Sequence, residues 1–526
     1  MNQHTTKYLS SLKIYSLLII YSFSVLFFCT TSSPFYILNT WNDSNVFFTM
    51  GKSMMNGLVP YRDLFEQKGP LLFLINGIGY IISNTTYIGI YLLQCLSLSI
   101  TLIFAYKLLC LYISKERAKL GTIILPLFIY YGTSYCGGGN TAEEYCLPFM
   151  MISLYYFMLY FKNTEDNKHK PLIMLIHGFN AACVFLIKFN LSAFWFGFGF
   201  IILIKLIAAK EFKNLFINVF YGLIGFSIPV IPFIIYFINA NGLKDAISMY
   251  LLLNFKYAED MSVSPNKFHF INIFFFTIGK IIVVHPFLVA AITISIISVS
   301  RDNNILSKYG QKAIILSVVI FYLAIYGSGH SSKYYIIPFS IFTIFGILYV
   351  IQKLDKVLPA RPTSLLIIAI FIATVFSNYI FVYHSHLIRN GKRILAQYAF
   401  AEIINKEAKP TLLELTEPGA TYSDGFLTAA NLLPATKYFS TPNLPYEKFP
   451  YPLEAQLELI KNKKIKFVIV MEKLKRTKEE FNQPPMGNLP IHYEIQEALL
   501  NNYKPIQSII QKNGAGEHIY TLYKLK

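Results

Sequence analysis

The stretch NGLVPYRDLFEQKGPLLFLINGIGY places four charged residues beside a rigid turn in a chain that is otherwise strongly apolar. Arg62, Asp63, Glu66 and Lys68 come close together, a Gly-Pro turn follows, and another apolar run then begins. Charged groups at the depth of a bilayer are expensive and usually mark a functional path. This stretch therefore predicts a polar site at the edge of a membrane.

Three polar segments carry the residue types that could do chemistry. Asp43 stands in NTWNDSNVFF, shortly before the charged stretch. Glu143 and Glu144 lie in YCGGGNTAEEYCLPF, on a Gly-rich turn at a helix start, and His330 and Lys333 lie in YGSGHSSKYYIIPF. All three segments fall on the same side of the predicted bilayer, so we expect them to converge on one polar pocket.

Structural roles compete with chemical ones for the acidic residues. Asp43 suits the start of the following helix, where Asp and Ser are favoured. Glu143 and Glu144 also lie at a helix N-terminus, which favours acidic side chains. From spacing alone, capping and chemistry are equally good interpretations of Asp43, and one of the two glutamates is expected to be structural.

The basic residues have structural alternatives as well. Arg62 and Lys68 could snorkel to lipid headgroups at a span end, and Asp63 could serve only as the ion-pair partner of Arg62. His330 on its own is more often a surface histidine than a ligand. Spacing alone supports no more than a polar pocket at the outer membrane face.

Composition identifies the class of protein. Of 526 residues, 54% are hydrophobic and only 14% are charged, whereas soluble proteins average about 25% charged residues. The net charge of +18 comes mainly from short loops between apolar blocks, where it signals topology. A nucleic-acid surface would need these cations on one solvated face, so we expect no nucleic-acid partner. The six cysteines lie at no metal-ligand spacing. Cys136 and Cys146 flank one polar loop and could pair, but apolar packing is the expected role of the cysteines.

The apolar blocks predict a polytopic α-helical membrane protein of about eleven spans, since each span needs about 20 mainly apolar residues. Basic residues recur in alternate short loops, which by the positive-inside rule puts the N-terminus inside and the C-terminus outside. We expect a multi-pass protein of the inner or plasma membrane. The predicted spans cover approximately residues 12–33, 86–113, 119–136, 145–161, 172–187, 189–208, 216–239, 277–300, 313–328, 336–352 and 364–384.

The composition changes to that of a soluble domain after about residue 385. KPTLLELT, KIKFVIVM and GEHIYTLYKLK have the pattern of short strands, while PLEAQLELIKNKK and YEIQEALLNN have that of amphipathic helices. We therefore predict two domains, a transmembrane domain over residues 1–384 and an extracytoplasmic α/β domain over residues 385–526. The second is expected to act as a lid, an acceptor-binding surface or a support.

The charged stretch closely resembles the first-loop signature of the GT-C class of integral-membrane glycosyltransferases. It is nearest to the bacterial branch related to protein O-mannosyltransferases and lipid A aminoarabinose transferases. Asp43-Ser44 and Lys68-Gly69-Pro70 depart from the commonest forms of that signature, which leaves the sub-family and substrate open. The matching positions are Asp43, Gly57, Pro60, Tyr61, Arg62, Asp63, Glu66, Lys68, Gly69 and Pro70.

The resemblance implies a sugar donor linked to polyprenyl phosphate and an envelope glycan, lipid or protein as acceptor, used outside the cytoplasm. It implies that Asp43 is the base for a hydroxyl nucleophile. It also implies that cations stabilise the lipid phosphate as it leaves. A single displacement would invert the anomeric carbon. The phosphate-binding candidates are Tyr61, Arg62, Lys68, His330 and Lys333.

The acidic residues of the second outer segment resemble an acidic position that contacts acceptor or metal in some members of the class. A hard divalent ion would need several oxygen ligands, and Glu66, Glu143 and Glu144 could supply some of them. A divalent metal is therefore a possible cofactor, with acceptor binding as the alternative role of these residues.

Three other functions fit parts of the sequence. A secondary transporter would show internal repeats with broken segments at mid-membrane, which the sequence does not show. A polysaccharide polymerase or ligase would carry its main charged motif in a late outer loop, whereas here the densest motif comes first. An assembly scaffold would tolerate loss of Asp43 and Lys68.

Overall fold

The chain is represented by a computed structural model. It describes residues 3–39, 41–132, 138–162, 168–255, 269–301, 306–327, 332–355, 357, 362–389, 395–416, 424–440, 446, 448–473, 490–513 and 516–526. Cys136, His330 and parts of several predicted loops lie outside these residues. The five described cysteines are free.

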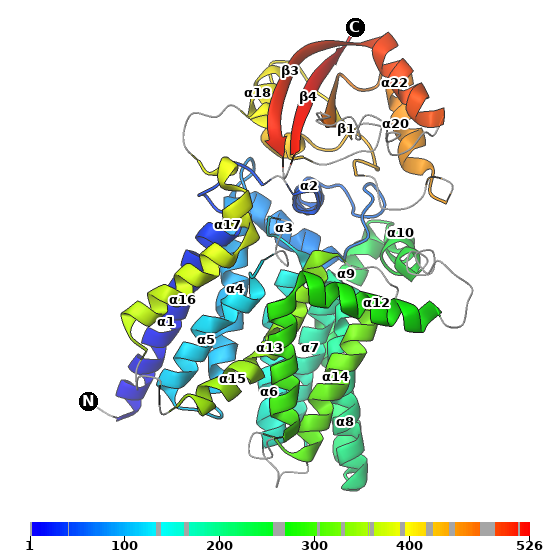
Figure 1. The fold of residues 1–526 in the computed structure, drawn as a ribbon. Helices are drawn as coiled ribbons and strands as arrows, with labels where there is room; N and C mark the ends of the chain where they lie inside the picture. Colours follow the sequence, from blue (N-terminus) through cyan, green and yellow to red (C-terminus); the bar gives the residue numbers. More distant parts are fainter. Residues whose placement is uncertain are drawn as a thin grey trace.

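Most of the chain forms a helical bundle, here residues 3–383, in which long apolar helices run side by side (Figure 1). The N-terminus lies at one end of the bundle and the C-terminal sheet covers the other (Figure 1). The bundle consists of α1 (Gln3–Cys29), α2 (Asn42–Met55), α3 (Pro70–Ile82), α4 (Ile88–Leu109), α5 (Lys115–Ile129), α6 (Ala142–Lys162), α7 (Pro171–Ile187), η2 (Phe189–Ala193), α8 (Phe194–Ala208), α9 (Phe212–Asn239), α10 (Leu243–Ala246), η3 (Ile247–Leu252), α12 (His269–Val284), α13 (Pro286–Arg301), α14 (Lys308–Tyr326), η4 (Lys333–Phe342), α15 (Thr343–Lys353), α16 (Ser364–Ser377) and α17 (Tyr379–Tyr383).

Every predicted span overlaps a helix of the bundle. By length and apolar composition, six helices of the described chain can cross a membrane, or seven if the bent pair α12 and α13 counts as one. That pair is bent by 112° at its break. The other predicted spans fall on helices such as α7 and α16, which are shorter apolar helices of 17 and 14 residues. The total of eleven spans and the inside position of the N-terminus stay predictions.

Two short helices, α2 and α3, lie at the end of the bundle that faces the C-terminal sheet (Figure 1). They meet at glycines, since a Cβ atom on Gly51 would lie 2.3 Å from the backbone nitrogen of Gly77. Pro70 begins α3 directly after the loop, a position where its missing N–H costs nothing. The close glycine contact fixes α2 on the upper surface of the bundle.

The C-terminal region, here residues 385–526, contains a four-stranded mixed sheet with the order β1-β2-β4-β3. The pair β1 and β2 is parallel, and the other two pairs are antiparallel. Its elements are η5 (Ser385–Leu387), α18 (Ala396–Ile404), β1 (Leu412–Thr416), α19 (Phe426–Ala429), α20 (Tyr451–Lys461), β2 (Phe467–Lys473), α22 (Pro490–Asn502), β3 (Tyr503–Asn513) and β4 (Gly516–Leu525).

The three strands and two helices expected from sequence are present, and one strand was not predicted. The missed strand β3 follows α22 without a turn, carries Pro505, and has a register shift between Pro505 and Gln507. Proline within a run argues against a strand, because it is tolerated only at edges and bulges. The strand occupies such an edge of the sheet.

The two faces of the sheet pack against different partners, as the period-two alternation of strands requires. Leu413 and Leu415 face a local core made with α20 and α22. Leu412 on the opposite face belongs to the large core that continues into the helical bundle. The sheet is therefore attached to the bundle through one face only.

We predict that Gly51→Ala destabilises the protein, because the added methyl group would overlap the backbone of α3. Overpacking of this kind costs about 1–3 kcal/mol in free energy of unfolding. Thermal unfolding in detergent measures the effect. The matched control is Gly199→Ala, since nothing lies within 4 Å of a Cβ at that helical position. Equal melting temperatures for the two variants would contradict the close helix contact.

Candidate active site

Asp43 lies in the first turn of α2, which begins at Asn42 with Trp41 in the cap position. Its side chain is partly buried. The carboxylate accepts a hydrogen bond of 3.1 Å from the hydroxyl of Tyr334, a residue of η4 that is distant in the sequence. The structure thus places Asp43 inside the helix rather than at its cap, with its carboxylate turned toward η4.

The charged loop holds Lys68 in place through its backbone. The hydroxyl of Tyr61 donates a 2.6 Å hydrogen bond to the carbonyl of Lys68. The next residue, Gly69, donates its N–H to the carbonyl of Ile187 at 3.0 Å. A Cβ on Gly69 would lie 2.0 Å from the carbonyl oxygen of Leu186, so only glycine allows the loop to seat on the end of α7.

The ammonium group of Lys68 lies among carboxylates. Its Nζ is 4.0 Å from Oε1 of Glu66, and both side chains are largely buried. The backbone N–H of Gln67 also donates to Glu66, at 2.8 Å. Lys68 is close enough to Asp43 for each to shift the pKa of the other.

A second lysine, Lys188, completes the charged cluster. It stands between α7 and η2, and its Nζ lies 2.5 Å from Oε1 of Glu143. The same ammonium lies 3.7 Å from the centre of the Tyr335 ring. Sequence reasoning missed Lys188, although it is the only residue between two predicted spans on the outer side.

The pKa values of this cluster follow from burial and mutual charge. Burial raises the pKa of Asp43, against the opposing effects of Lys68 and the Tyr334 hydrogen bond. Burial also raises the pKa of Glu66. For Lys68, burial lowers the pKa, but the charges of Glu66 and Asp43 outweigh it and the net shift is upward. Asp43 is thus a stronger base than an ordinary aspartate, beside a lysine that stays charged.

The remaining residues of the charged stretch form a separate contact. Arg62 binds Asp63 through two hydrogen bonds of 2.8 and 2.7 Å and donates a third, of 2.5 Å, to the carbonyl of Ala240. The Arg62 hydrogen bond lowers the pKa of Asp63. Lys437 of the C-terminal region lies 4.0 Å from Asp245 nearby. Asp63 is thus an ion-pair partner of Arg62, and Arg62 also joins the loop to the end of α9.

The two glutamates of the second outer segment point to different partners. Glu143 faces Lys188, as described above. Glu144 is buried and accepts a 2.8 Å hydrogen bond from the amide of Gln94 in α4, so it is the structural member of the pair. Lys333 is exposed at the start of η4, and His330 lies outside the described residues.

The carboxylates do not fit a divalent metal site. Within the described part of the chain, no group of three or more His, Cys, Asp or Glu side chains is placed to hold a metal ion. Glu66 faces Lys68, Glu143 pairs with Lys188, and Glu144 turns toward α4. We therefore assign the positive charge of this site to the two lysines.

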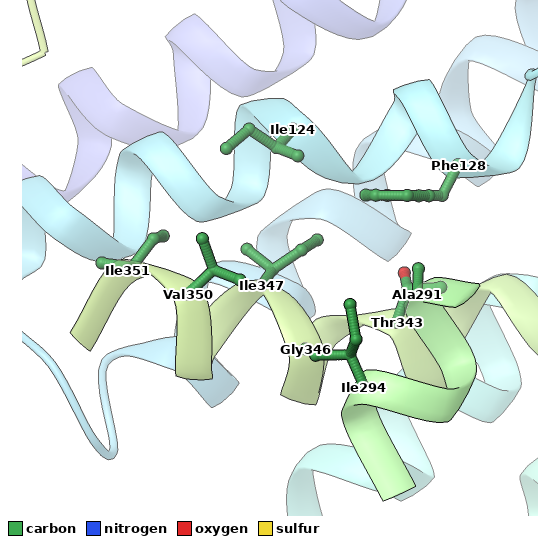
Figure 2. Close-up of a pocket in the computed structure, with 9 residues that line it drawn as sticks. All are labelled: Ile124, Phe128, Ala291, Ile294, Thr343, Gly346, Ile347, Val350 and Ile351. Carbon is green, nitrogen blue, oxygen red and sulfur yellow. The ribbon is translucent and has the colours of Figure 1, made fainter. Parts of the chain in front are cut away.

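An apolar groove of about 150 Å³ opens between α5, α13 and α15 (Figure 2). Its only side-chain hydroxyl belongs to Thr343 and donates to the carbonyl of Ser340 at 2.6 Å, so it is already satisfied. Helix α15 continues directly from η4, which carries Tyr334. A groove without free polar groups suits a hydrocarbon chain. Its lining comprises Ile124, Phe128, Ala291, Ile294, Thr343, Gly346, Ile347, Val350 and Ile351.

Residues 3–361 match the family model described as Putative competence-induced protein Ccs4 N-terminal domain. The chain belongs to this family. The match covers the whole cluster around Asp43 and ends before the C-terminal region. No curated protein sequence matches the chain.

Solved structures define the fold of this Ccs4-family chain. ArnT from Cupriavidus metallidurans bound to undecaprenyl phosphate is similar with a TM-score of 0.55 and 10% identity, over 97% of each chain. Its apo form gives a TM-score of 0.52 and 11% identity, over 99% of this chain and 98% of ArnT. The oligosaccharyltransferase AglB from Archaeoglobus fulgidus gives 0.50 and 12%, over 95% of this chain and 80% of AglB. Both relatives are GT-C glycosyltransferases, so the GT-C fold indicated by the first-loop motif is confirmed.

We predict that Lys188→Met strongly destabilises the protein, because it leaves Glu143 buried without its partner. Removing one member of a buried pair costs about 3–5 kcal/mol in free energy of unfolding. Denaturant unfolding measures the loss, and adding Glu143→Gln should recover part of it. The control is Lys168→Met, since Lys168 is exposed and 3.8 Å from Glu211, where a pair contributes only about 0–1 kcal/mol. Similar losses at both lysines would contradict the assignment.

Proposed function

We propose that the protein is a glycosyltransferase that moves a sugar from a polyprenyl-phosphate donor to an envelope acceptor on the extracytoplasmic face. The observation that carries this proposal is the juxtaposition of Asp43 and Lys68 at the end of the bundle that faces the C-terminal region. The GT-C fold supports the class of reaction.

Three features support the lipid-linked donor. ArnT has been solved with undecaprenyl phosphate and AglB with a dolichol-phosphate, both of them polyprenyl phosphates. In this chain, Lys68 and Lys188 supply two cations beside Asp43. The apolar groove in Figure 2 has the chemistry to receive part of a polyprenyl chain.

The reaction follows from these roles as a single displacement. The acceptor hydroxyl forms a bond to the anomeric carbon while its proton passes to the Asp43 carboxylate. The bond from that carbon to the phosphate oxygen breaks, and the polyprenyl phosphate leaves with the electron pair. One such displacement inverts the anomeric configuration and needs no covalent intermediate.

Lys68 is the proposed stabiliser of the leaving phosphate. A fixed ammonium stabilises negative charge that grows on the phosphate oxygen, and it does so more strongly where water is scarce. Lys188, which pairs with Glu143, is the second cation whose charge acts on Asp43, whereas Arg62 lies in a separate contact with Asp63 and Ala240. Tyr61 acts on Lys68 through its backbone carbonyl and is a positioning residue.

The outward orientation of the site follows from the charge pattern of the loops. Short basic loops belong on the cytoplasmic side. Helix α2, which carries Asp43, lies at the end of the bundle opposite the N-terminus (Figure 1). We therefore place the active site and the C-terminal region outside the inner or plasma membrane. Nucleotide sugars are absent there, which is why a lipid-linked donor is required.

Asp43→Asn is expected to abolish sugar transfer, because an amide cannot accept the proton of the acceptor hydroxyl. Mass spectrometry of envelope glycans and lipids compares cells that carry wild-type or variant protein at equal abundance. We expect one glycan or lipid to lose a sugar, which would name both sugar and acceptor. Lys68→Ala is expected to reduce the same product by weakening donor use.

The matched control for this experiment is Asp245→Asn, a carboxylate near Lys437 on the far side of the loop. It should leave the product unchanged. If Asp43→Asn and Lys68→Ala both retain the full product, the site assignment is wrong. If no glycan depends on the wild-type protein at all, a scaffold function gains support.

The activity should also depend on pH through Asp43. A base works only when it is deprotonated, and burial raises the pKa of Asp43. As the pH is lowered, activity should therefore begin to fall at a pH higher than the usual aspartate pKa of about 4. Tyr334→Phe removes a hydrogen bond that lowers this pKa. In that variant, the acidic side of the curve of activity against pH, here called the acid limb, should therefore move to higher pH.

Product formation in isolated membranes with their endogenous donor, followed against pH, measures this shift. Tyr322→Phe is the control, because its hydroxyl donates to the carbonyl of Phe274 instead. An acid limb that stays in place in Tyr334→Phe, or moves to lower pH, would argue against Asp43 as the base.

A further inference from the structure

A buried lysine joins α2 to the C-terminal region. The side chain of Lys52 is almost completely buried, with 1% of its surface exposed. Its ammonium donates a 2.9 Å hydrogen bond to the carbonyl oxygen of Leu427 in α19, which is 375 positions further along the chain. Lysine is almost never fully buried unless it is paired, so this contact calls for an explanation.

The acceptor side of this contact is built around a buried carboxylate. Glu414 of β1 is 6% exposed, and it accepts hydrogen bonds from the backbone N–H groups of Asp424 at 2.9 Å and Leu427 at 3.1 Å. Glu414 thus binds the backbone at the start of the short helix α19, and a carbonyl oxygen of α19 accepts the hydrogen bond from Lys52. The carboxylate and the ammonium lie close enough to attract each other.

Burial has the largest effect on the pKa of both Lys52 and Glu414. It lowers the pKa of Lys52 to about 7, with the charge of Glu414 opposing the shift. It raises the pKa of Glu414 to about 8, with the two backbone hydrogen bonds and Lys52 opposing the shift. Such costs are seldom retained for stability alone, since apolar side chains of similar volume are often more stable than a buried charge pair.

Further hydrogen bonds lie along the same contact. The hydroxyl of Tyr87 donates to the side chain of Asn45 in α2 and lies 3.4 Å from the hydroxyl of Thr428 in α19. The hydroxyl of Tyr398 in α18 donates to the carbonyl of Ile37 at 2.9 Å. The C-terminal region therefore contacts both α2 and the segment that leads into it.

We propose that Lys52 is a positioning residue for the sugar-transfer reaction, because it clamps the Asp43-bearing helix α2 between α3 and the C-terminal region. This inference rests on the proposed function. Lys52 and Asp43 belong to one helix, nine residues apart, which corresponds to about 14 Å along its axis. Lys52 and Gly51 hold the C-terminal end of α2, and the hydrogen bond from Tyr87 to Asn45 holds the end near Asp43. Restraint at both ends limits the tilt of the helix, so the carboxylate of Asp43 keeps its position.

Hydrogen–deuterium exchange of the full-length protein tests the clamp directly. In Lys52→Met, which keeps the length of the side chain but removes its donor, amides of α2 should exchange about tenfold faster, the effect of losing about 1.4 kcal/mol of local stability. Glu414→Gln should act in the same direction and serves as the second variant. Lys461→Met is the control, because it breaks an exposed 2.8 Å pair with Glu494 in the same region.

Two further readouts separate positioning from simple structural support. Binding of undecaprenyl phosphate per amount of folded protein should be unchanged in Lys52→Met, while the glycan product identified through Asp43→Asn, normalised in the same way, decreases at least severalfold. Unchanged exchange of α2 in both variants would overturn the clamp, and faster exchange with a full product would overturn its role in transfer. If Asp43→Asn itself changes no glycan, the proposed function fails, while the exchange result still decides whether the clamp exists.

Discussion

The site depends on the need to neutralise charge where water is scarce. Three carboxylates, from Asp43, Glu66 and Glu143, share two ammonium groups, from Lys68 and Lys188. None of these charges would be tolerated alone at this burial. Burial raises the pKa of both Asp43 and Glu66, and the charge of Lys68 opposes both shifts. The same arrangement that satisfies electrostatics thereby creates a base beside a permanent cation.

Helix ends supply the geometry for this balance. Asp43 and Glu143 stand in the first turns of α2 and α6, Lys188 follows the end of α7, and Lys68 lies just before α3. Each of these residues lies in a helix or within two residues of one. Glycine at position 69 lets two of these ends touch. The helices of the bundle therefore determine where all four charged side chains lie.

Much of this could be predicted from the sequence, because it is encoded locally. The apolar blocks predicted the helices of the bundle, and the alternation of apolar and polar residues predicted three of the four strands. The charged stretch indicated the GT-C fold. The edge strand β3 was missed because a proline and a bulge break its pattern. Contacts between distant parts of the chain were less visible. No local signal shows that Lys188 pairs with Glu143, that Glu144 turns to α4, or that Arg62 donates to the carbonyl of Ala240. Tertiary packing decides which side chains pair with one another, and a single sequence does not show that packing.

The two-sided packing of the C-terminal sheet sets different evolutionary constraints on its two faces. Residues such as Leu413, packed on α20 and α22, can change together with those helices without reference to the rest of the protein. Residues such as Leu412 and Phe467 share a core with the bundle and must change in step with it. A substitution on the outer face can therefore be accommodated by changes in α20 and α22 alone, whereas one on the inner face also requires changes in the bundle.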